Sequence, residues 1–176
     1  MHVGHNGIAL VQRFEGCYSC IPGGTVNGKV KPKPVANLRD VNQTVYSYRC
    51  SANVPTIGWG NTMWADGTPV ADGDECTLDE ANQLFYTEID EFAEGVARLI
   101  KTEITQNMFD ALVCFAFNVG LGNLKNSTLL KVVNAGQFDQ VREQFMRWNK
   151  AGGKELPGLT KRRSAEADLF ETPDSE

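Results

Sequence analysis

Residues 105–120 read TQNMFDALVCFAFNVG, and this stretch decides the fold because its middle is apolar on nearly every side of a helix. A helix that is apolar all round is normally buried inside a protein. Thr105 is of a residue type that caps the start of a helix, and Gly120 is of the type that ends one. We therefore predict a central buried helix between these two residues.

Helical spacing continues on both sides of this segment. Thr77 and Glu80 have the spacing of a capping box, and the apolar residues after them recur at helical intervals. This pattern predicts a long helix over residues 78–101 that links a small lobe to a larger one. Further amphipathic helices are predicted over residues 127–134, 138–148 and 160–170.

The beginning of the chain predicts a first helix with an acidic residue on its apolar side. Asn6 can cap a helix that runs to about Tyr18. On that helix Glu15 shares one stripe with Ile8, Val11 and Tyr18. Glu15 is therefore expected to lie against apolar neighbours rather than in open solvent.

The stretch between this helix and residue 77 has a different composition. Proline and glycine are dense over residues 19–47, which predicts a long inserted loop with room for a short hairpin. Residues 45–76 alternate β-type side chains with glycines, and Asp66-Gly67 suits a tight turn, so we predict a small antiparallel β-lobe there. The expected fold class is α+β and mainly helical, with a single domain over residues 1–176 and a helical lobe over residues 77–171.

Composition excludes several classes of function. The 176 residues can bury a core without disulfides or metals. The formal net charge of −5 argues against nucleic acid as a partner, because phosphates require a basic surface. No apolar run has the length of a membrane span, and the first residues lack the plan of a signal peptide. We expect a soluble protein without a membrane anchor.

The five cysteines are an odd number, so at least one is unpaired within a monomer. Cys114 lies in a very apolar stretch and is expected to be an inert core thiol. The Cys17-x-x-Cys20 spacing is a weak metal signal, because the only histidines, His2 and His5, lie at the terminus. We expect no metal and no cofactor.

Glu15 has the setting that glycoside hydrolysis requires of an acid. Breaking a glycosidic bond needs an acid at the leaving oxygen and a group that activates water on the other face of the sugar. Burial against apolar neighbours keeps a carboxyl protonated near neutral pH. The alternative is a half-buried glutamate held by an arginine or by backbone donors.

Several motifs resemble the phage-type lysozymes, the endolysin muramidases of phages such as T4 and P22 (glycoside hydrolase family 24). The family has a glutamate at the end of its first helix, an aspartate or cysteine in a small sheet, and a threonine six positions later; Cys50 and Thr56 keep that interval, since 56 − 50 = 6. The blocks that carry the resemblance, in order, are Arg13-Phe14-Glu15-Gly16, Tyr48-Arg49-Cys50 with Thr56-Ile57-Gly58-Trp59-Gly60, residues 109–120 with Ser127-Thr128-Leu129-Leu130, and Gly158-Leu159-x-x-Arg162-Arg163-x-x-Glu166-x-x-Leu169-Phe170.

The resemblance implies a lysozyme-like fold, with the glycan held between a small β-lobe and a larger helical lobe. It implies hydrolysis of the β-1,4 bond between N-acetylmuramic acid and N-acetylglucosamine in bacterial peptidoglycan. Glu15 would be the general acid, Thr56 would position the attacking water, and Cys50 takes the position where many members have aspartate. Arg162 falls where the family has an arginine near the catalytic glutamate and would have an orienting role. Three further residues would border the glycan, namely Phe117, Asn118 and Ser127.

The resemblance also implies where the protein acts. A monomeric endolysin would accumulate in the host cytoplasm and then reach the periplasm and cell wall through a separate holin-type protein. No signal in the sequence suggests a cofactor for this activity.

Three departures from the family pattern bear on the mechanism. A neutral thiol is a poor base, so either the pKa of Cys50 is lowered, or Cys50 mainly places water, or a neighbouring residue shares the role of base. Asp40 could take the place of Cys50 as the base, although its spacing to Thr56 does not fit. The interval from Glu15 to Cys50 is long, and its extra lysines would either touch wall polymer or belong to a tolerated surface insertion, which we favour. Asn61 stands where the family often has histidine.

Spare cysteines near Glu15 allow one redox hypothesis. Cys50 could pair with Cys17 or Cys20, which would hold the enzyme inactive until the bond is reduced or reshuffled.

Other readings remain open at this point. A cysteine peptidase or amidase that uses Cys50 as nucleophile would need a nearby histidine. A non-catalytic glycan-binding module would keep aromatic residues such as Trp59 and Trp64 but lose turnover. A lytic transglycosylase would form an anhydro sugar instead of adding water, and Thr56 as a water holder favours hydrolysis.

Overall fold

A computed structural model describes residues 1–19, 25–26, 29–30, 32–50 and 52–174 of the chain. The chain forms two compact units, residues 1–14 with 89–176 and residues 15–88. The boundaries between the units fall inside two helices, α1 (His5–Glu15) and α2 (Leu78–Leu99). The assignment of a single domain with a β-lobe over residues 45–76 stays a prediction.

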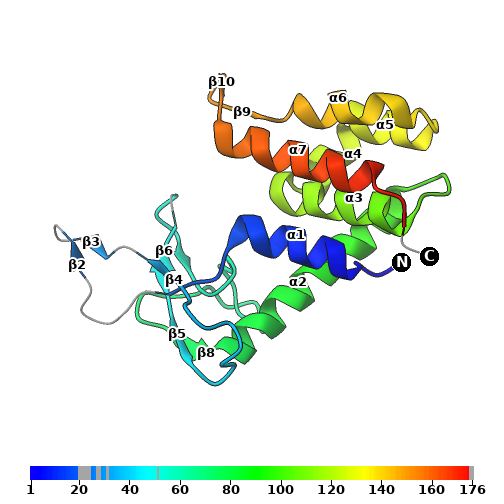
Figure 1. Ribbon diagram of the computed structural model, residues 1–176. Helices are drawn as coiled ribbons and strands as arrows, with labels where there is room; N and C mark the ends of the chain where they lie inside the picture. The colour runs from blue at the N-terminus through cyan, green and yellow to red at the C-terminus, as the bar shows by residue number, and fades with distance from the viewer. Residues whose placement is uncertain (20–24, 27–28, 31, 51, 175–176) are drawn as a thin grey trace. The chain divides into compact units, whose positions relative to one another are not determined.

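The described part of the chain contains seven α-helices and several two-stranded antiparallel sheets (Figure 1). Most of the helices belong to the first unit and all but two of the strands to the second. Besides α1 and α2, the helices are α3 (Gln106–Val119), α4 (Leu121–Asn126), α5 (Thr128–Asn134), α6 (Val141–Met146) and α7 (Pro157–Glu171).

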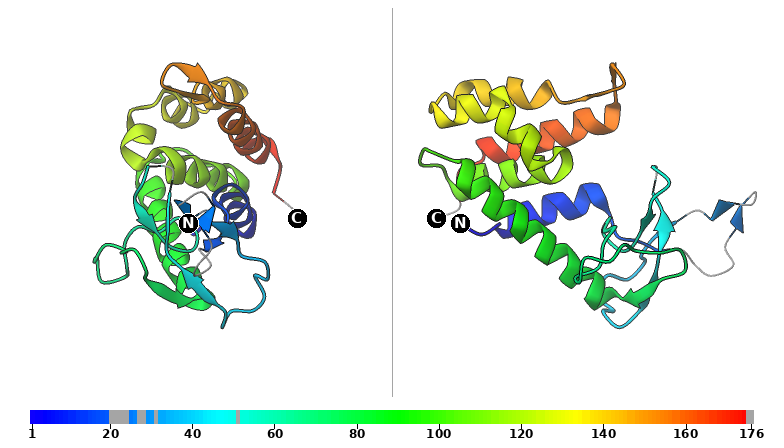
Figure 2. Two further views of the ribbon diagram at one scale, coloured as in Figure 1. Left: turned by 90° about the vertical axis from the view of Figure 1, so that its left-hand side faces the viewer. Right: turned by 180° about the vertical axis from the view of Figure 1, so that it is seen from behind.

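The predicted central helix is α3, and its burial confirms the interpretation of residues 105–120. The Thr105 side chain accepts a hydrogen bond from the Met108 N–H, and Gly120 follows the last helical residue. Every residue from Phe109 to Ala116 is buried. Around this helix pack α7 and α4, and α6 packs in turn against α7 and α5; Figures 1 and 2 show α7, in orange and red, alongside α3.

The start of α1 is held by a carboxylate from α3 rather than by its own cap. Asp110, which is buried, accepts hydrogen bonds from the backbone N–H groups of Gly4 (2.8 Å) and Gly7 (2.9 Å). Asn6 lies inside the helix, and its side chain donates to Asn107 Oδ1 at 2.9 Å. The prediction that Asn6 caps this helix is therefore wrong, because a donor-rich helix start is satisfied across the fold.

The first helix also ends earlier than the sequence pattern predicted. It stops at Glu15, and Tyr18 belongs to strand β1 (Tyr18–Ser19). Gly16 has φ +67°, a left-handed conformation that ends a helix and that glycine adopts without strain. Helical periodicity carried the prediction past this glycine to Tyr18.

The predicted β-lobe consists of short paired strands. Strand β5 (Thr44–Tyr46) pairs with β8 (Glu75–Thr77), and β6 (Tyr48–Arg49) pairs with β7 (Pro55–Thr56). At the expected Asp66-Gly67 turn, the Gly67 N–H donates to the Trp64 carbonyl at 2.9 Å and the Trp64 N–H to the Thr68 carbonyl at 2.8 Å. The predicted turn at Asp66-Gly67 is therefore confirmed.

The described part of the stretch 19–47 contains the short antiparallel pair that the sequence allowed and one further strand pair. Strand β4 (Lys33–Pro34) pairs with β1, and β2 (Thr25–Val26) with β3 (Lys29–Val30) forms a short hairpin. Lys33 is exposed, whereas the side chains of Lys29 and Lys31 lie outside the described residues.

Helix α2 begins as the sequence predicted. The Thr77 N–H donates to the Glu80 carboxylate at 2.8 Å, and the Glu80 N–H donates to the Thr77 hydroxyl at 3.2 Å, which makes a capping box. None of the described helices is both long enough and apolar enough to cross a membrane.

The last third differs from the prediction in detail. The helix expected over 138–148 is a 3₁₀ turn, Phe138–Gln140, followed by the shorter α6. Helix α4 and a small hairpin of β9 (Lys150–Ala151) with β10 (Lys154–Glu155) were not predicted. The helix expected from residue 160 begins three residues earlier, at Pro157, which suits the first helical position.

Candidate functional site

Glu15, the predicted acid, is the last residue of α1 and is half-buried. The left-handed Gly16 turns the chain out of the helix directly after it, and an added Cβ at Gly16 would lie 2.7 Å from the Tyr18 ring. The Tyr18 N–H then donates to the Gly58 carbonyl at 3.0 Å. Helix end and glycine turn together fix the place where the Glu15 side chain emerges.

The hairpin of β6 and β7 carries the two other predicted catalytic residues. Tyr48 is paired directly with Thr56, and Arg49 with Pro55. The Cys50 N–H donates to the Val54 carbonyl at 3.0 Å, which closes the turn that follows β6. Cys50 therefore lies at the turn of the hairpin, and Thr56 lies two residues beyond Val54 on the returning strand.

The pairing of β6 with β7 places Cys50 and Thr56 close together on this hairpin. Hydrogen bonds from the backbone N–H groups of Val54 and Ala52 and from the Thr56 hydroxyl lower the pKa of the Cys50 thiol, against a smaller opposing effect of burial. Thr56 is buried, and its hydroxyl is also placed to donate to the Val54 carbonyl at 2.9 Å. Because a hydroxyl has one proton, Thr56 can serve either the carbonyl or a Cys50 thiolate.

Tyr48 is a site residue to which the sequence pattern gave no role. Burial raises the pKa of its phenol, and the negative charges of Cys17, Cys50 and Glu15 raise it further. Its ring meets the Tyr18 ring edge-on, with 6.0 Å between the ring centres. Tyr48 thus lies within electrostatic reach of both Glu15 and Cys50, and its period-two spacing to Cys50 was the signal that could have found it.

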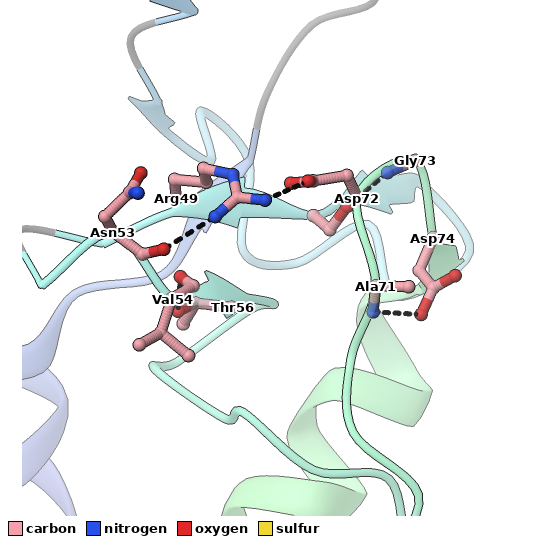
Figure 3. Close-up of polar contacts among 9 residues, drawn as sticks. Arg49, Asn53, Val54, Thr56, Ala71, Asp72, Gly73 and Asp74 are labelled. Atoms are coloured by element: carbon pink, nitrogen blue, oxygen red, sulfur yellow. Dashed lines mark hydrogen bonds and ion pairs between the residues drawn. The ribbon is translucent and has the colours of Figure 1, made fainter.

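Arg49 fastens the turn beside Cys50 on the outer face of the hairpin (Figure 3). Its Nη1 donates to the Asn53 carbonyl at 2.6 Å, and its Nη2 forms an ion pair with Asp72. Asn53 has φ +62°, a conformation that asparagine tolerates better than most residues.

The motif Ile57-Gly58-Trp59-Gly60 packs the site against α2. An added Cβ at Gly58 would lie 2.7 Å from the Ala81 Cβ, so a glycine is needed for this close approach. Trp59 is buried, and its indole N–H donates to Asn82 Oδ1 at 2.8 Å. Trp59 is therefore a core residue and is not available to stack on a glycan.

Asn61, which stands where the family often has histidine, is also buried. Its amide donates to the Glu88 carboxylate at 2.7 Å, while its Oδ1 has no hydrogen-bond partner among the described residues. Asp40, the weaker candidate for a base, is exposed and belongs to a hydrogen-bonded turn of residues 37–43. Nothing in this turn supports Asp40 in the place of Cys50.

The other compact unit contains the predicted orienting residue and the three predicted glycan contacts, namely Arg162, Phe117, Asn118 and Ser127. Arg162 is buried, with its Nε 3.1 Å from Glu166 and its guanidinium carbon 5.5 Å from the centre of the Phe14 ring. Asn118 is exposed and accepts a hydrogen bond from Arg163, and Phe117 packs on Phe92.

Ser127 has a structural role in the same unit. Its buried hydroxyl donates to the Leu124 carbonyl at 2.7 Å and accepts from the Leu130 N–H at 3.0 Å, which caps α5. A contact of Ser127 with glycan stays a prediction.

The described cysteines differ sharply in their surroundings. Burial raises the pKa of Cys17 to about 12 and that of Cys76 to about 11, and it also raises the pKa of Cys114 well above the ordinary value. Cys17 and Cys50 are free thiols, so the hypothetical Cys17–Cys50 bond is not formed; Cys20 lies outside the described residues. Cys50 is the described cysteine whose environment favours the thiolate.

Among the described residues, no group of three or more histidine, cysteine, aspartate or glutamate side chains could hold a metal ion.

Comparison with known proteins identifies the family of the chain. The family model described as phage lysozyme matches residues 43–166, which include the hairpin with Cys50 and Thr56. The chain belongs to the phage lysozyme family. The resemblance inferred from the sequence motifs is thereby confirmed.

Individual relatives of the family differ in length. An endolysin of Bacillus phage B103 is 46% identical over 120 residues, which cover 68% of the chain and 44% of that relative, so the chain spans less than half of its length. An endolysin of Acyrthosiphon pisum secondary endosymbiont phage 1 is 32% identical over 176 residues and is covered to 99%, with 98% of this chain.

A solved member of the family has the same fold. The endolysin from Escherichia coli O157:H7 phage FAHEc1 superimposes with a TM-score of 0.75 at 31% identity, covering 97% of this chain and 94% of that chain. The predicted α+β, mainly helical, lysozyme-like fold is confirmed.

Proposed function

We propose that this protein is an endolysin that hydrolyses the β-1,4 bond between N-acetylmuramic acid and N-acetylglucosamine in bacterial peptidoglycan and so lyses the host cell. The observation that carries the proposal is the β6–β7 hairpin, which holds Cys50 and Thr56 close together in the same compact unit as Glu15. Membership of the phage lysozyme family supports the same reaction class.

Each residue has a defined step in this reaction. Glu15 donates its proton to the glycosidic oxygen as the bond to the anomeric carbon breaks. The Thr56 hydroxyl orients a water molecule, and the Cys50 thiolate takes a proton from that water as its oxygen bonds to the anomeric carbon. The products are a reducing muramic end and a free hydroxyl on N-acetylglucosamine, so that one water is consumed for each bond cleaved.

The hydrogen bonds around Cys50 support its role as the base. A thiol with an ordinary pKa of ~8.5 is mostly protonated at neutral pH and accepts protons poorly. Because hydrogen bonds, above all that from the Val54 backbone, lower the pKa of Cys50, its thiolate fraction at neutral pH is increased. Of the three explanations considered for a cysteine at this position, a lowered pKa has the most support.

The remaining assignments belong to the same proposal. Arg162 is proposed as an orienting residue, and Phe117 and Asn118 as glycan contacts within their own unit; the capping role of Ser127 makes its glycan contact the weakest of these. We propose that the monomer accumulates in the host cytoplasm and reaches the periplasm and cell wall with the help of a separate holin-type protein.

Product analysis on purified peptidoglycan tests the proposal. The wild type, Glu15→Gln and the control Glu91→Gln are compared by mass spectrometry of the released fragments; Glu91 is an exposed residue of α2. We expect reducing muramic ends from the wild type and from the control. Glu15→Gln should release fewer of these ends by a factor of about 10² or more.

Other products would contradict the proposal. Anhydro-muramic ends would mean a lytic transglycosylase and would give Thr56 another role. Freed peptides or amines with intact glycan chains would direct attention to Cys50 as a nucleophile. Binding without any product would indicate a non-catalytic glycan-binding module.

A further inference from the structure

Arg49 occupies the position between Tyr48 and Cys50, but its side chain is on the opposite face of strand β6. Successive side chains of a strand alternate between the two faces of a sheet. Tyr48 is accordingly buried, whereas the Arg49 side chain is 45% exposed. Arg49 therefore does not contact the reacting groups, and its influence on Cys50 must pass through the backbone of the turn.

The Arg49 guanidinium holds the far side of that turn. Its Nη1 donates to the Asn53 carbonyl at 2.6 Å (Figure 3). The Asn53 N–H donates in turn to the Cys50 carbonyl at 2.9 Å. Asn53 is the described non-glycine residue with a positive φ, so its conformation is one that needs support from its surroundings. The guanidinium supplies this support to Asn53, which directly precedes Val54. The Val54 N–H in turn donates to the Cys50 sulfur.

Asp72, the ionic partner of Arg49, lies on a well-fastened turn. Its neighbour Asp74 accepts hydrogen bonds from the Ala71 N–H (2.8 Å) and the Trp64 indole N–H (3.0 Å). The Gly73 N–H donates to the Ser47 hydroxyl at 3.0 Å, and the Ser47 N–H donates to the Asp74 carbonyl at 2.8 Å. Asp72 thus presents its carboxylate to Arg49 from a segment that is itself tied to the start of β6.

We propose that Arg49 is a positioning residue for Cys50: anchored by Asp72, it holds Asn53 so that the backbone N–H groups of Ala52 and Val54 stay directed at the Cys50 sulfur. The proposal rests on the proposed function in so far as Cys50 is the base of the reaction. A planar, forked guanidinium can serve a carbonyl and a carboxylate together, which a lysine ammonium cannot reproduce.

The polar and charged groups around Cys50 indicate that Arg49 affects the Cys50 thiol by holding the turn in place. The groups that favour its thiolate are the N–H groups of Val54 and Ala52 and the hydroxyl of Thr56, and the nearby titratable groups are Tyr48, on the same hairpin, and through Tyr48 also Glu15. The donors that favour the thiolate are thus groups of the hairpin itself. Loss of Arg49 should therefore raise the pKa of Cys50 only if the turn moves.

The test compares Arg49→Gln, Asp72→Asn and their combination with a matched control, Arg142→Gln. Arg142 is likewise a half-exposed arginine that pairs with carboxylates, Asp168 and Glu171, in the other compact unit. The rate of alkylation by iodoacetamide is followed between pH 5 and 10 at the peptide that carries Cys50, by mass spectrometry. The kcat and KM on peptidoglycan are measured in parallel, and thermal melting confirms that each variant is folded.

We expect the inflection of Cys50 alkylation to move to higher pH in Arg49→Gln and in Asp72→Asn, with the alkylation rate at pH 7 reduced roughly threefold to tenfold because the thiolate fraction falls. The kcat should fall roughly tenfold while KM changes by less than about twofold, since positioning and not binding is lost. The double variant should resemble Arg49→Gln, because both substitutions remove one linkage.

An alkylation profile and kcat that match those of Arg142→Gln would overturn the proposal and make Arg49–Asp72 an ordinary surface ion pair. Asp72→Asn keeps the size of the side chain, so it carries the test if Arg49→Gln does not fold. A shifted alkylation profile in a protein that cleaves no glycan would uphold the positioning role and refute the proposed function.

Discussion

Tyr48 and Thr56 lie directly opposite each other across the β6–β7 hairpin, and Cys50 follows Tyr48 by two residues. Directly paired residues of antiparallel strands share one face, and so do residues two apart along a strand. The three side chains therefore belong to one face, with Arg49 on the other. This register explains how the Thr56 hydroxyl comes to serve the Cys50 sulfur.

Replacing Thr56 by valine should disable the reaction with little change of shape. The substitution removes the hydroxyl that stabilises the Cys50 thiolate and orients the water, so the pKa of Cys50 should rise and kcat should fall on the order of a hundredfold. Steady-state kinetics on peptidoglycan and the pH dependence of Cys50 alkylation measure the two effects. Thr56→Ser keeps the hydroxyl and is the control; equal losses in both variants would mean that the hydroxyl has no part in the reaction.

Replacing Cys50 by aspartate should preserve activity but move its pH dependence. The base must be deprotonated, so kcat/KM rises with pH through the pKa of the residue at position 50. In the wild type this rise should fall below the ordinary thiol pKa of ~8.5, because hydrogen bonds lower the pKa of Cys50. In Cys50→Asp it should fall near the carboxyl range, at about pH 4.

The Cys50→Ser variant gives the matching negative result. A serine hydroxyl is similar in size but does not ionise near neutral pH, so this variant should lose most of its activity at every pH tested. Full activity in Cys50→Ser would show that Cys50 only places water and is not the base.

The parts of the fold that the sequence predicted are those specified by residues close together in the chain. The burial of α3, its Thr105 cap, the capping box of Thr77 with Glu80 and the turn at Asp66-Gly67 all depend on spacings of at most a few residues. The end of α1 was mispredicted because helical periodicity was followed through Gly16. The anchoring of the helix start by Asp110 joins residues about a hundred positions apart, which no local pattern can indicate.

The same distinction applies to the candidate site. Glu15, Cys50 and Thr56 could be named because the family motif fixes their order and spacing. Tyr48 and Arg49 were part of a quoted motif, yet their roles depend on contacts with Tyr18, Asn53 and Asp72 that are set by strand pairing and turn geometry. The lowered pKa of Cys50 likewise follows from backbone donors of a turn and not from the identity of its neighbours.

Replacing Gly16 by alanine should lower both stability and activity. The residue has φ +67°, and a Cβ would lie 2.7 Å from the Tyr18 ring, so we expect a loss of about 1–2 kcal/mol in the free energy of unfolding. Because Gly16 directly follows Glu15, the acid should also be displaced and peptidoglycan cleavage reduced. Urea unfolding and product release measure the two effects.

Gly122→Ala is the matched control for this substitution. Gly122 lies in α4, and an added Cβ there would have no heavy atom within 4 Å. It should stabilise the protein by up to about 1 kcal/mol and leave activity unchanged, because alanine favours the helix. Equal stability changes in Gly16→Ala and Gly122→Ala would refute the role given to the left-handed turn.

Replacing Glu166 by glutamine should destabilise the helical unit far more than the same change at Glu171. The Glu166 carboxylate is fully buried and lies 3.1 Å from Arg162 Nε and 3.2 Å from Arg163 Nη1, and burial lowers the pKa of Arg163. Neutralising Glu166 leaves two buried guanidinium groups without their carboxylate, which typically costs about 3–5 kcal/mol in the free energy of unfolding.

Glu171 also pairs with an arginine, at 2.6 Å from Arg142 Nη2, but its side chain is 46% exposed and the pair is screened by water. Glu171→Gln should therefore cost less than about 1 kcal/mol. Urea unfolding of both variants measures the difference, and Glu166→Asp, which keeps the charge at a shorter reach, should fall between them. Similar losses at the two positions would mean that the buried pair contributes no more than a surface pair, and that shape alone determines the packing of α7 on α3.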